Sequence, residues 1–163
     1  MSRRGILAGM AAGVVLLMAS SLQDTTPRLI WNASASVPTG LYWIAPGPVR
    51  RDDLVLIRLP PAIADLADQR GYLPRSAYLL KFVISVTGDR VCRFGDRLLV
   101  NGALRARAFA RDRQHRHMPV WHGCHRLASG QVFVLAEEPD SFDSRYFGPL
   151  SHRHIIGRGV RIW

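Results

Sequence analysis

The sequence predicts a mainly β protein preceded by one N-terminal helix. Three observations support this prediction: short runs of branched and aromatic residues recur along the chain, Gly, Pro, Asp and Asn separate them, and an uncharged apolar segment lies near the N-terminus. After that segment about 140 of the residues remain, which is enough for one domain with a single core.

The apolar segment covers residues 5–22. As a helix it would span roughly 27 Å, close to the hydrocarbon thickness of a bilayer, about 30 Å. Two arginines precede it, so we expect a cytoplasmic N-terminus over residues 1–4, a transmembrane anchor, and an exported domain over residues 23–163. The alternative is a secretory signal that is cleaved near residues 18–20.

The elements of the domain follow a short polar linker. Prolines at the start and a glycine at the end predict one helix over residues 60–71. Asn101-Gly102 is typical of a tight hairpin turn. Residues 104–125 are charged and lack a clear period, so we expect an exposed loop there. The predicted strands are 29–31, 41–44, 54–57, 78–86, 97–100, 131–135 and 159–163.

Cys92 and Cys124 fit an exported protein, because oxidising compartments allow disulfides and two cysteines have one possible pairing. We expect them to be bonded and to bend the 104–125 loop back. Closing this loop would stabilise the fold by roughly 3 to 4 kcal/mol in the chain-entropy model. The alternative is two separate buried thiols.

The formal net charge of +10 favours acidic partners. For a domain held at a membrane, the nearest anionic surface is the lipid headgroup layer. Nucleic acid is the other interpretation, but no aromatic residues interleave with the clustered arginines to form a stacking platform. We therefore expect a lipid surface as a partner and no nucleic acid. We also expect no cofactor and a monomer. The clustered residues are Arg105, Arg107, Arg111, Arg113, Arg116 and Arg126.

Lys81 stands inside an apolar run over residues 78–84, where a solvated cation has no evident place. Burial disfavours the charged amine, so its pKa falls and it can act as a neutral base. A serine hydroxyl needs such a base to become a nucleophile, and the candidate is Ser36. The alternative is a strand lysine that extends its amine to the surface.

Three segments resemble the characteristic boxes of type I signal peptidases, and most closely their TraF-like conjugative-transfer relatives. Residues 34–42, Ser-Ala-Ser-Val-Pro-Thr-Gly-Leu-Tyr, are similar to the nucleophile box. Residues 80–89 are similar to the general-base box, and residues 141–149, which contain Asp-Ser-Arg, resemble the C-terminal box. The resemblance covers residues 31–160 and implies a signal-peptidase/LexA-like β-rich catalytic domain.

The resemblance implies a role for each matching residue. Ser36 takes the place of the nucleophile and Lys81 that of the general base. Ser141 would hydrogen-bond the lysine amine and orient it, while Asp143 and Arg145 would form an ion pair that shapes the site. From the residues alone, such a pair could instead belong to an exposed turn, where it would add little stability.

The family also suggests two donors for the oxyanion, the backbone amide of Ser36 and the hydroxyl of Ser34. Small polar residues such as Ser34 also occur in loops without any such role. The chain departs from the family pattern in two places. Val37 replaces the usual methionine, and residues 136–140 replace the Gly-Asp-Asn run of cellular signal peptidases.

The six histidines raise the question of a metal site. His115 and His117 form one pair and His152 and His154 another, but no carboxylate or cysteine completes an evident ligand set, so we expect no metal. A Ser-His-Asp enzyme is a further alternative. It is disfavoured because the sequence has no Gly-x-Ser-x-Gly nucleophile elbow.

Together with the resemblance, these patterns predict a serine endopeptidase anchored in a bacterial inner membrane, with its catalytic domain in the periplasm, that cleaves an exported precursor. The resemblance to conjugative relatives implies a pilin subunit of a conjugation apparatus as the substrate. Water or a substrate amine would resolve the acyl-enzyme, and the amine would give a cyclised pilin. The alternative is a noncatalytic scaffold of a secretion channel that keeps the peptidase fold. A self-cleaving repressor is disfavoured, because the anchor stands where a DNA-binding domain would be.

Overall fold

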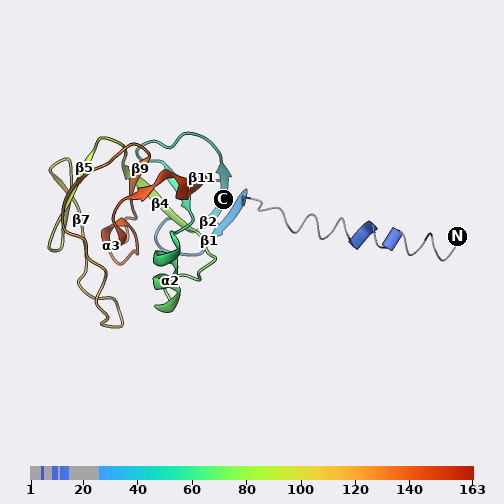
Figure 1. Ribbon diagram of the computed structural model, residues 1–163, viewed down its shortest axis with the longest axis horizontal. Helices are drawn as coiled ribbons and strands as arrows, with labels where there is room; N and C mark the ends of the chain where they lie inside the picture. Colours follow the sequence, from blue (N-terminus) through green and yellow to red (C-terminus); the bar gives the residue numbers. More distant parts are fainter. Residues whose placement is uncertain (1–4, 6–8, 11, 15–25) are drawn as a thin grey trace.

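The computed structural model describes residues 5, 9–10, 12–14 and 26–163. Most of the predicted anchor over residues 5–22 therefore lies outside the described residues. Among the residues that are described, no helix is long and apolar enough to cross a membrane. Residues 26–163 form two β-sheets and two α-helices (Figure 1).

Seven antiparallel strands form the larger sheet, in the order β1-β2-β11-β3-β4-β9-β10. Strand β4 pairs with β3 along one edge and with β9 along the other, so it is a central strand. The bounds are β1 Leu29–Asn32, β2 Gly40–Ala45, β3 Leu54–Ile57, β4 Leu79–Ser85, β9 Gln131–Leu135, β10 Leu150–Ser151 and β11 Ile155–Arg161.

The smaller sheet has the order β7-β6-β5-β8, with β5 Arg90–Phe94, β6 Arg97–Val100, β7 Ala103–Arg107 and β8 Gly123–Arg126. The prediction of an exposed loop over residues 104–125 is wrong at both ends, because β7 and β8 occupy them. Most side chains of these two edge strands are exposed on both faces. Neither strand therefore shows the apolar alternation that would reveal it in the sequence.

The other predicted elements are confirmed. All seven predicted strands are present, and the predicted helix is α2, Pro61–Gln69. Proline at its first position needs no backbone N–H, which is why the helix begins there. Two further short elements follow β9, the helix α3, Ser144–Phe147, and a 3-10 turn, His152–His154.

Apolar clusters cover both faces of the larger sheet. On one face, Val55 and Val83 pack with the buried side of α2, and on the other Leu56 and Leu80 pack with residues of β2. Successive side chains of a strand point to opposite faces. Lys81 therefore points to the same face as Val83, the face that α2 covers. A further cluster fills the space beside the smaller sheet.

The predicted disulfide is present. Cys92 and Cys124 are directly paired residues of β5 and β8, separated by 32 positions in sequence. The alternative of two separate thiols is wrong. The bond closes residues 93–123 into a loop and joins the edge strand β8 to the rest of the smaller sheet.

Replacing both cysteines by serine is expected to lower the free energy of unfolding by about 3 to 4 kcal/mol, because the unfolded chain loses its loop constraint. Urea unfolding of the oxidised wild type and of the double variant measures the difference. Adding a reductant is the control, since it should destabilise the wild type by the same amount and leave the variant unchanged. A difference below about 1 kcal/mol would contradict the prediction.

Candidate active site

Ser36 lies in the loop between β1 and β2. The strands form an antiparallel hairpin in which Asn32 pairs with Gly40, and residues 33–39 connect them. Within this loop Val37 is buried, and the hydroxyl of Tyr42 donates to the carbonyl of Pro38 at 2.6 Å. Both contacts anchor the part of the loop that follows Ser36, whose own side chain is half-buried.

Gly40 ends this loop at a place where no larger residue fits. A Cβ atom there would lie 2.1 Å from the carbonyl oxygen of Trp163, and the φ angle is 146°. The backbone of the C-terminal residue approaches closely because it accepts a hydrogen bond from the amide of Leu41 at 2.8 Å. The backbone of Trp163 is thus attached beside the loop that carries Ser36.

Lys81 is buried, with 3% of its surface exposed. Loss of water lowers the pKa of its amine from 10.5 to about 8, while the negative charge of Asp143 opposes the fall and the positive charge of Arg145 adds to it. Lys81 is also the only lysine in the chain. The predicted alternative, an amine at the surface, is therefore wrong. An arginine at this position could not become a neutral base, because its guanidinium keeps its proton in proteins.

Ser141 connects the two residues. The amine of Lys81 donates to Ser141 Oγ at 2.7 Å, and Ser141 Oγ lies 3.1 Å from Ser36 Oγ within hydrogen-bonding geometry. Among the described residues, no hydrogen bond joins Lys81 Nζ directly to Ser36 Oγ. Ser36 and Ser141 lie 105 positions apart in the sequence, and with Lys81 they form one continuous hydrogen-bonded chain.

Asp143 and Arg145 form a buried ion pair beside this chain. Arg145 Nε and Nη2 lie 3.0 Å from the two carboxylate oxygens of Asp143, with exposed fractions of 2% and 0% for the two side chains. Burial raises the pKa of the Asp143 carboxyl, and the Arg145 guanidinium and two backbone amides oppose that rise. The alternative of an exposed turn is wrong for these two residues.

The ion pair also folds the segment before it. Asp143 caps α3 by accepting from the amide of Arg145 at 3.0 Å, and it accepts from the amide of Ala136 at 2.9 Å. Arg145 donates to the carbonyls of Ala136 and Pro139, both at 2.5 Å. Arg145 thus holds the segment 136–140, which directly precedes Ser141 and in which the sequence departs from the family pattern.

Sequence reasoning missed two buried polar residues that support the site. Arg93, 2% exposed, donates to the carbonyl of Arg145 at 2.5 Å and so joins β5 to α3. Asn32 holds the loop of Ser36 and accepts a hydrogen bond from the hydroxyl of Ser34 at 2.8 Å. An arginine inside the strand pattern Arg-Val-Cys-Arg-Phe carries no sequence signal for burial. An asparagine just before the nucleophile box does suggest a loop anchor.

Two clefts meet at Ser36. One, of about 320 Å³, is lined by Trp31, Leu79 and Leu80, together with the polar residues Asn32 and Lys81. The other, of about 510 Å³, is lined by Arg70, Asp112 and Ser141, together with the apolar residues Phe109 and Met118. Both clefts therefore combine polar and apolar walls where they meet at Ser36.

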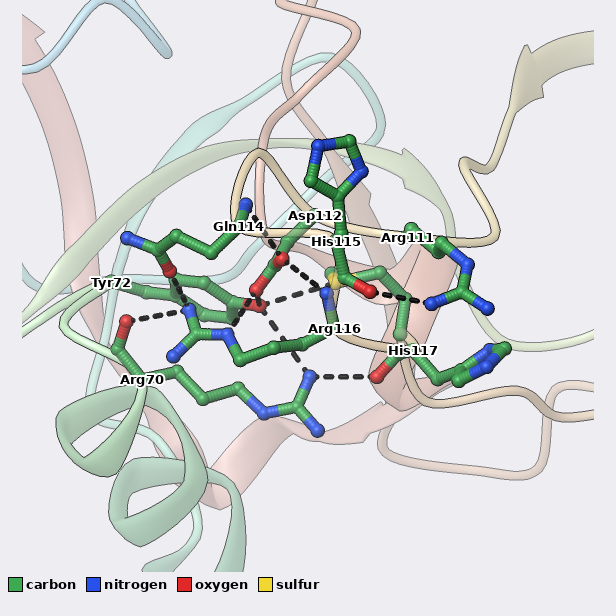
Figure 2. A network of polar contacts seen from close by, with 9 residues as sticks. Arg70, Tyr72, Arg111, Asp112, Gln114, His115, Arg116 and His117 are labelled. Atoms are coloured by element: carbon green, nitrogen blue, oxygen red, sulfur yellow. Dashed lines mark hydrogen bonds and ion pairs between the residues drawn. The ribbon is translucent and has the colours of Figure 1, made fainter.

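Residues 111–117 form a hydrogen-bonded turn, several residues of which line the 510 Å³ cleft, and Figure 2 shows its network of polar contacts. The hydroxyl of Tyr72 donates to Asp112 at 2.6 Å, and Asp112 also accepts from Arg116 Nε at 2.6 Å. Arg70 donates to the carbonyl of His117 at 2.8 Å, which fastens the turn to the end of α2. Among the described residues, no group of three or more His, Cys, Asp or Glu side chains could hold a metal ion.

Residues 2–163 match the protein family described as Signal peptidase, peptidase S26. The chain belongs to this signal peptidase family. The match includes both sheets, so the mainly β architecture predicted from the sequence is the fold of a signal peptidase.

Relatives of this signal peptidase include conjugation proteins. A plasmid transfer protein TraF of Escherichia coli is 32% identical, over 97% of this chain and 98% of the relative. A conjugal transfer protein TraF of Agrobacterium fabrum is 28% identical, over 96% and 94%. The predicted resemblance to TraF-like proteins is thereby confirmed.

Two other similarities are more distant. A probable thylakoidal processing peptidase 2 of Arabidopsis thaliana is 33% identical, over 68% of this chain and 28% of the relative. The crystal structure of a signal peptidase I from Enterococcus faecalis aligns with a TM-score of 0.41 and 19% identity, over 70% of this chain and 98% of that chain.

The single lysine allows the pKa of Lys81 to be measured directly. In full-length protein labelled with ¹³C-lysine and held in detergent micelles, the side-chain signal should titrate with a midpoint of about 8. The amine is charged below this pH and neutral above it, so the base form grows as pH rises, from about a tenth at pH 7.

The same protein unfolded in urea is the control, and its midpoint should return toward 10.5. A midpoint near 10 in the folded protein would contradict the burial of the amine.

Proposed function

We propose that this protein is a membrane-anchored serine endopeptidase that uses Ser36 as nucleophile and Lys81 as general base. The observation that carries the proposal is a buried amine with a pKa of about 8, linked through Ser141 to a serine at the junction of two clefts. Membership of a peptidase family supports the same conclusion. An amine of this pKa is neutral often enough at neutral pH to accept a proton.

The first half of the reaction forms an acyl-enzyme. Ser36 Oγ bonds to the carbonyl carbon of the scissile peptide while its proton passes to Ser141 Oγ, and the hydroxyl proton of Ser141 passes to the neutral Lys81 amine. The C–N bond then breaks, and the leaving amine takes the proton from Lys81. The acyl group remains on Ser36 until water, or an amine of the substrate, displaces it.

The negative charge on the carbonyl oxygen needs hydrogen-bond donors during this step. We assign them to the backbone amide of Ser36 and the hydroxyl of Ser34. The Ser34 hydroxyl donates to Asn32 Oδ1 in the resting structure, so it must rotate toward the substrate to take this role. A donor of this kind typically lowers the barrier by about 2.7 to 4 kcal/mol.

The substrate we propose is an exported precursor, and specifically a pilin subunit for conjugative transfer. The support comes from the names of the relatives, a plasmid transfer protein and a conjugal transfer protein that match this chain over nearly their whole length. If an amine of the substrate resolves the acyl-enzyme, the product is a cyclic pilin with a mass one water below that of the hydrolysed form.

Ser36→Ala and Lys81→Met should each lower precursor processing by at least about 10³-fold, because neither the nucleophile nor the base has a substitute. Mass spectrometry of the pilin from cells that express each variant measures the products. Ser129→Ala and Arg126→Met are matched controls at exposed positions and should process normally.

A serine-reactive penem probe tests the alternative of a noncatalytic scaffold. It should acylate the wild type and fail to acylate Ser36→Ala. Processing that persists in either dyad variant, or a wild type that the probe does not label, would overturn the proposed function.

We also propose that one face of the larger sheet rests on the lipid surface of the inner membrane, with the domain on the periplasmic side. Two rows of apolar side chains cross β1, β2 and the C-terminal strand there: Leu29, Trp43 and Val160 are directly paired, and Trp31 pairs with Leu41 in the next row. Apart from Leu41, these residues are strongly exposed, with exposed fractions between 44% and 56%.

The C-terminus extends the same face. Trp163 is 74% exposed, and its ring packs against that of Trp31, tilted by 32° with centroids 5.6 Å apart. Tryptophan is the residue that membrane interfaces favour, because it joins an apolar ring to a polar N–H. Strand β1 begins close after the uncharged segment over residues 5–22, so a retained anchor would deliver this face to the bilayer.

Single-tryptophan variants of the full-length protein in vesicles test this orientation. With lipids brominated near the headgroups, fluorescence of a variant that keeps only Trp31 or only Trp163 should be quenched several-fold more than that of a variant that keeps only Trp121. Trp121 is the matched internal control, because it packs against Phe133 of β9, far across the sheet from β1. Equal quenching of all variants would contradict the proposed face.

A further inference from the structure

Asn32, the last residue of β1, is a buried polar side chain with 7% of its surface exposed. All of its side-chain hydrogen bonds reach the loop that carries Ser36. Nδ2 donates to the carbonyls of Ser34 at 2.9 Å, Val37 at 3.0 Å and Pro38 at 3.2 Å. Oδ1 accepts from the amide of Ser34 at 3.2 Å and from its hydroxyl at 2.8 Å.

These bonds replace the backbone ladder that ends at Asn32 and Gly40. Between those residues the loop receives only two other side-chain donors to its backbone among the described residues, Tyr42 to the carbonyl of Pro38 and Arg161 to the carbonyl of Thr39. Both of these act after Ser36. Asn32 is the side chain that holds the backbone before Ser36 as well as after it.

A peptide unit is planar, so fixing a carbonyl also fixes the direction of the next N–H. Asn32 binds the carbonyl of Ser34, two residues before Ser36, and that of Val37, one residue after it. The two contacts restrict how the backbone at Ser36 can rotate, and with it the hydroxyl and amide that the reaction uses. The bond from Ser34 keeps the second oxyanion donor at a defined resting position.

We propose that Asn32 is the positioning residue of the Ser36 loop: its carboxamide sets the geometry of the nucleophile and holds the Ser34 hydroxyl ready to turn toward the substrate. The proposal rests on the proposed function of Ser36. It requires both ends of the carboxamide, because the nitrogen supplies donors to three carbonyls and the oxygen accepts from Ser34. An aspartate would keep the acceptor and lose the donors.

The experiment measures acylation of Ser36 by a penem probe in full-length Asn32→Leu and Asn32→Asp variants, separating the maximal rate from the probe concentration at half-maximal rate. Asn32→Leu should lower the maximal rate about 10²-fold, because a misplaced nucleophile loses reactivity more than affinity. The half-maximal concentration should stay within about threefold of wild type, since the walls of the clefts are intact.

Asn32→Asp supplies a pH signature that a merely structural role would not give. At pH 8 its carboxylate faces three carbonyls without a donor, and its maximal rate should fall as in the leucine variant. A protonated acid regains one O–H donor, so the ratio of the Asn32→Asp rate to the wild-type rate should rise as pH falls toward 5. Expressing the result as a ratio removes the titration of Lys81, which both proteins share.

Asn101→Ala is the matched control. It also removes a carboxamide that makes two hydrogen bonds, to the amide of Arg90 and the carboxylate of Asp89, but it lies in a hairpin turn of the smaller sheet. Its acylation rate should equal that of wild type whatever the change in its melting temperature.

The outcomes separate this inference from the proposed function. The role of Asn32 alone is overturned if the probe labels the wild type and the Asn32 variants acylate at the wild-type rate. It is also overturned if the Asn32 variants lose no more rate than Asn101→Ala does. A wild type that the probe does not label overturns the proposed function and this inference with it.

Discussion

The Lys81 amine is held in a nearly dry position, and the chemistry of the site depends on that constraint. Lowering its pKa from 10.5 to about 8 means that the folded environment destabilises the charged amine, relative to the neutral amine, by about 3 kcal/mol. The position of β4 keeps the amine buried. Strand β4 is paired on both edges, and Lys81 lies directly opposite Val55 of β3, so hydrogen bonds to both neighbouring strands hold the backbone of Lys81 in place.

The hydrogen-bond partner of that amine is fixed by a second buried arrangement. Ser141 precedes the Asp143–Arg145 ion pair, which caps α3 and holds the carbonyls of the preceding segment. A buried ion pair is stable only when its remaining donors and acceptors are satisfied, and here backbone groups on both sides provide that. Arg93 adds a bond from the smaller sheet. Both sheets thus contribute to the placement of one serine hydroxyl.

The β1–β2 hairpin combines two properties that the proposed function requires. Its connecting loop carries Ser36, and its outer face carries the exposed tryptophans. Trp163 contributes to both, since its ring packs against that of Trp31 while its backbone oxygen accepts from the amide of Leu41, beside Gly40. A domain that meets the bilayer through this face would have its nucleophile at the same end of the molecule, close to where a membrane-inserted precursor emerges.

The sequence by itself determined the elements with strong local signals and the identity of the candidate dyad. Strands with apolar runs, such as residues 54–57, and the proline-started helix were predictable because their patterns are local. The exposed edge strands β7 and β8 were not, since pairing and a disulfide rather than an apolar face hold them. The three boxes named Ser36, Lys81 and Ser141 because the residue types and their order are specific to one family.

Tertiary structure alone decided how these residues meet. The resemblance implies that Ser141 binds the lysine amine and that Asp143 pairs with Arg145. No sequence pattern shows that Ser141 Oγ also contacts Ser36 Oγ, that the ion pair is buried, or that Arg93 supports α3. Each of these facts depends on groups far apart in the chain, whose burial and hydrogen bonds exist only after the two sheets have packed. The sequence determined which groups are candidates for the reaction, and the packing of the sheets determined their burial and their geometry.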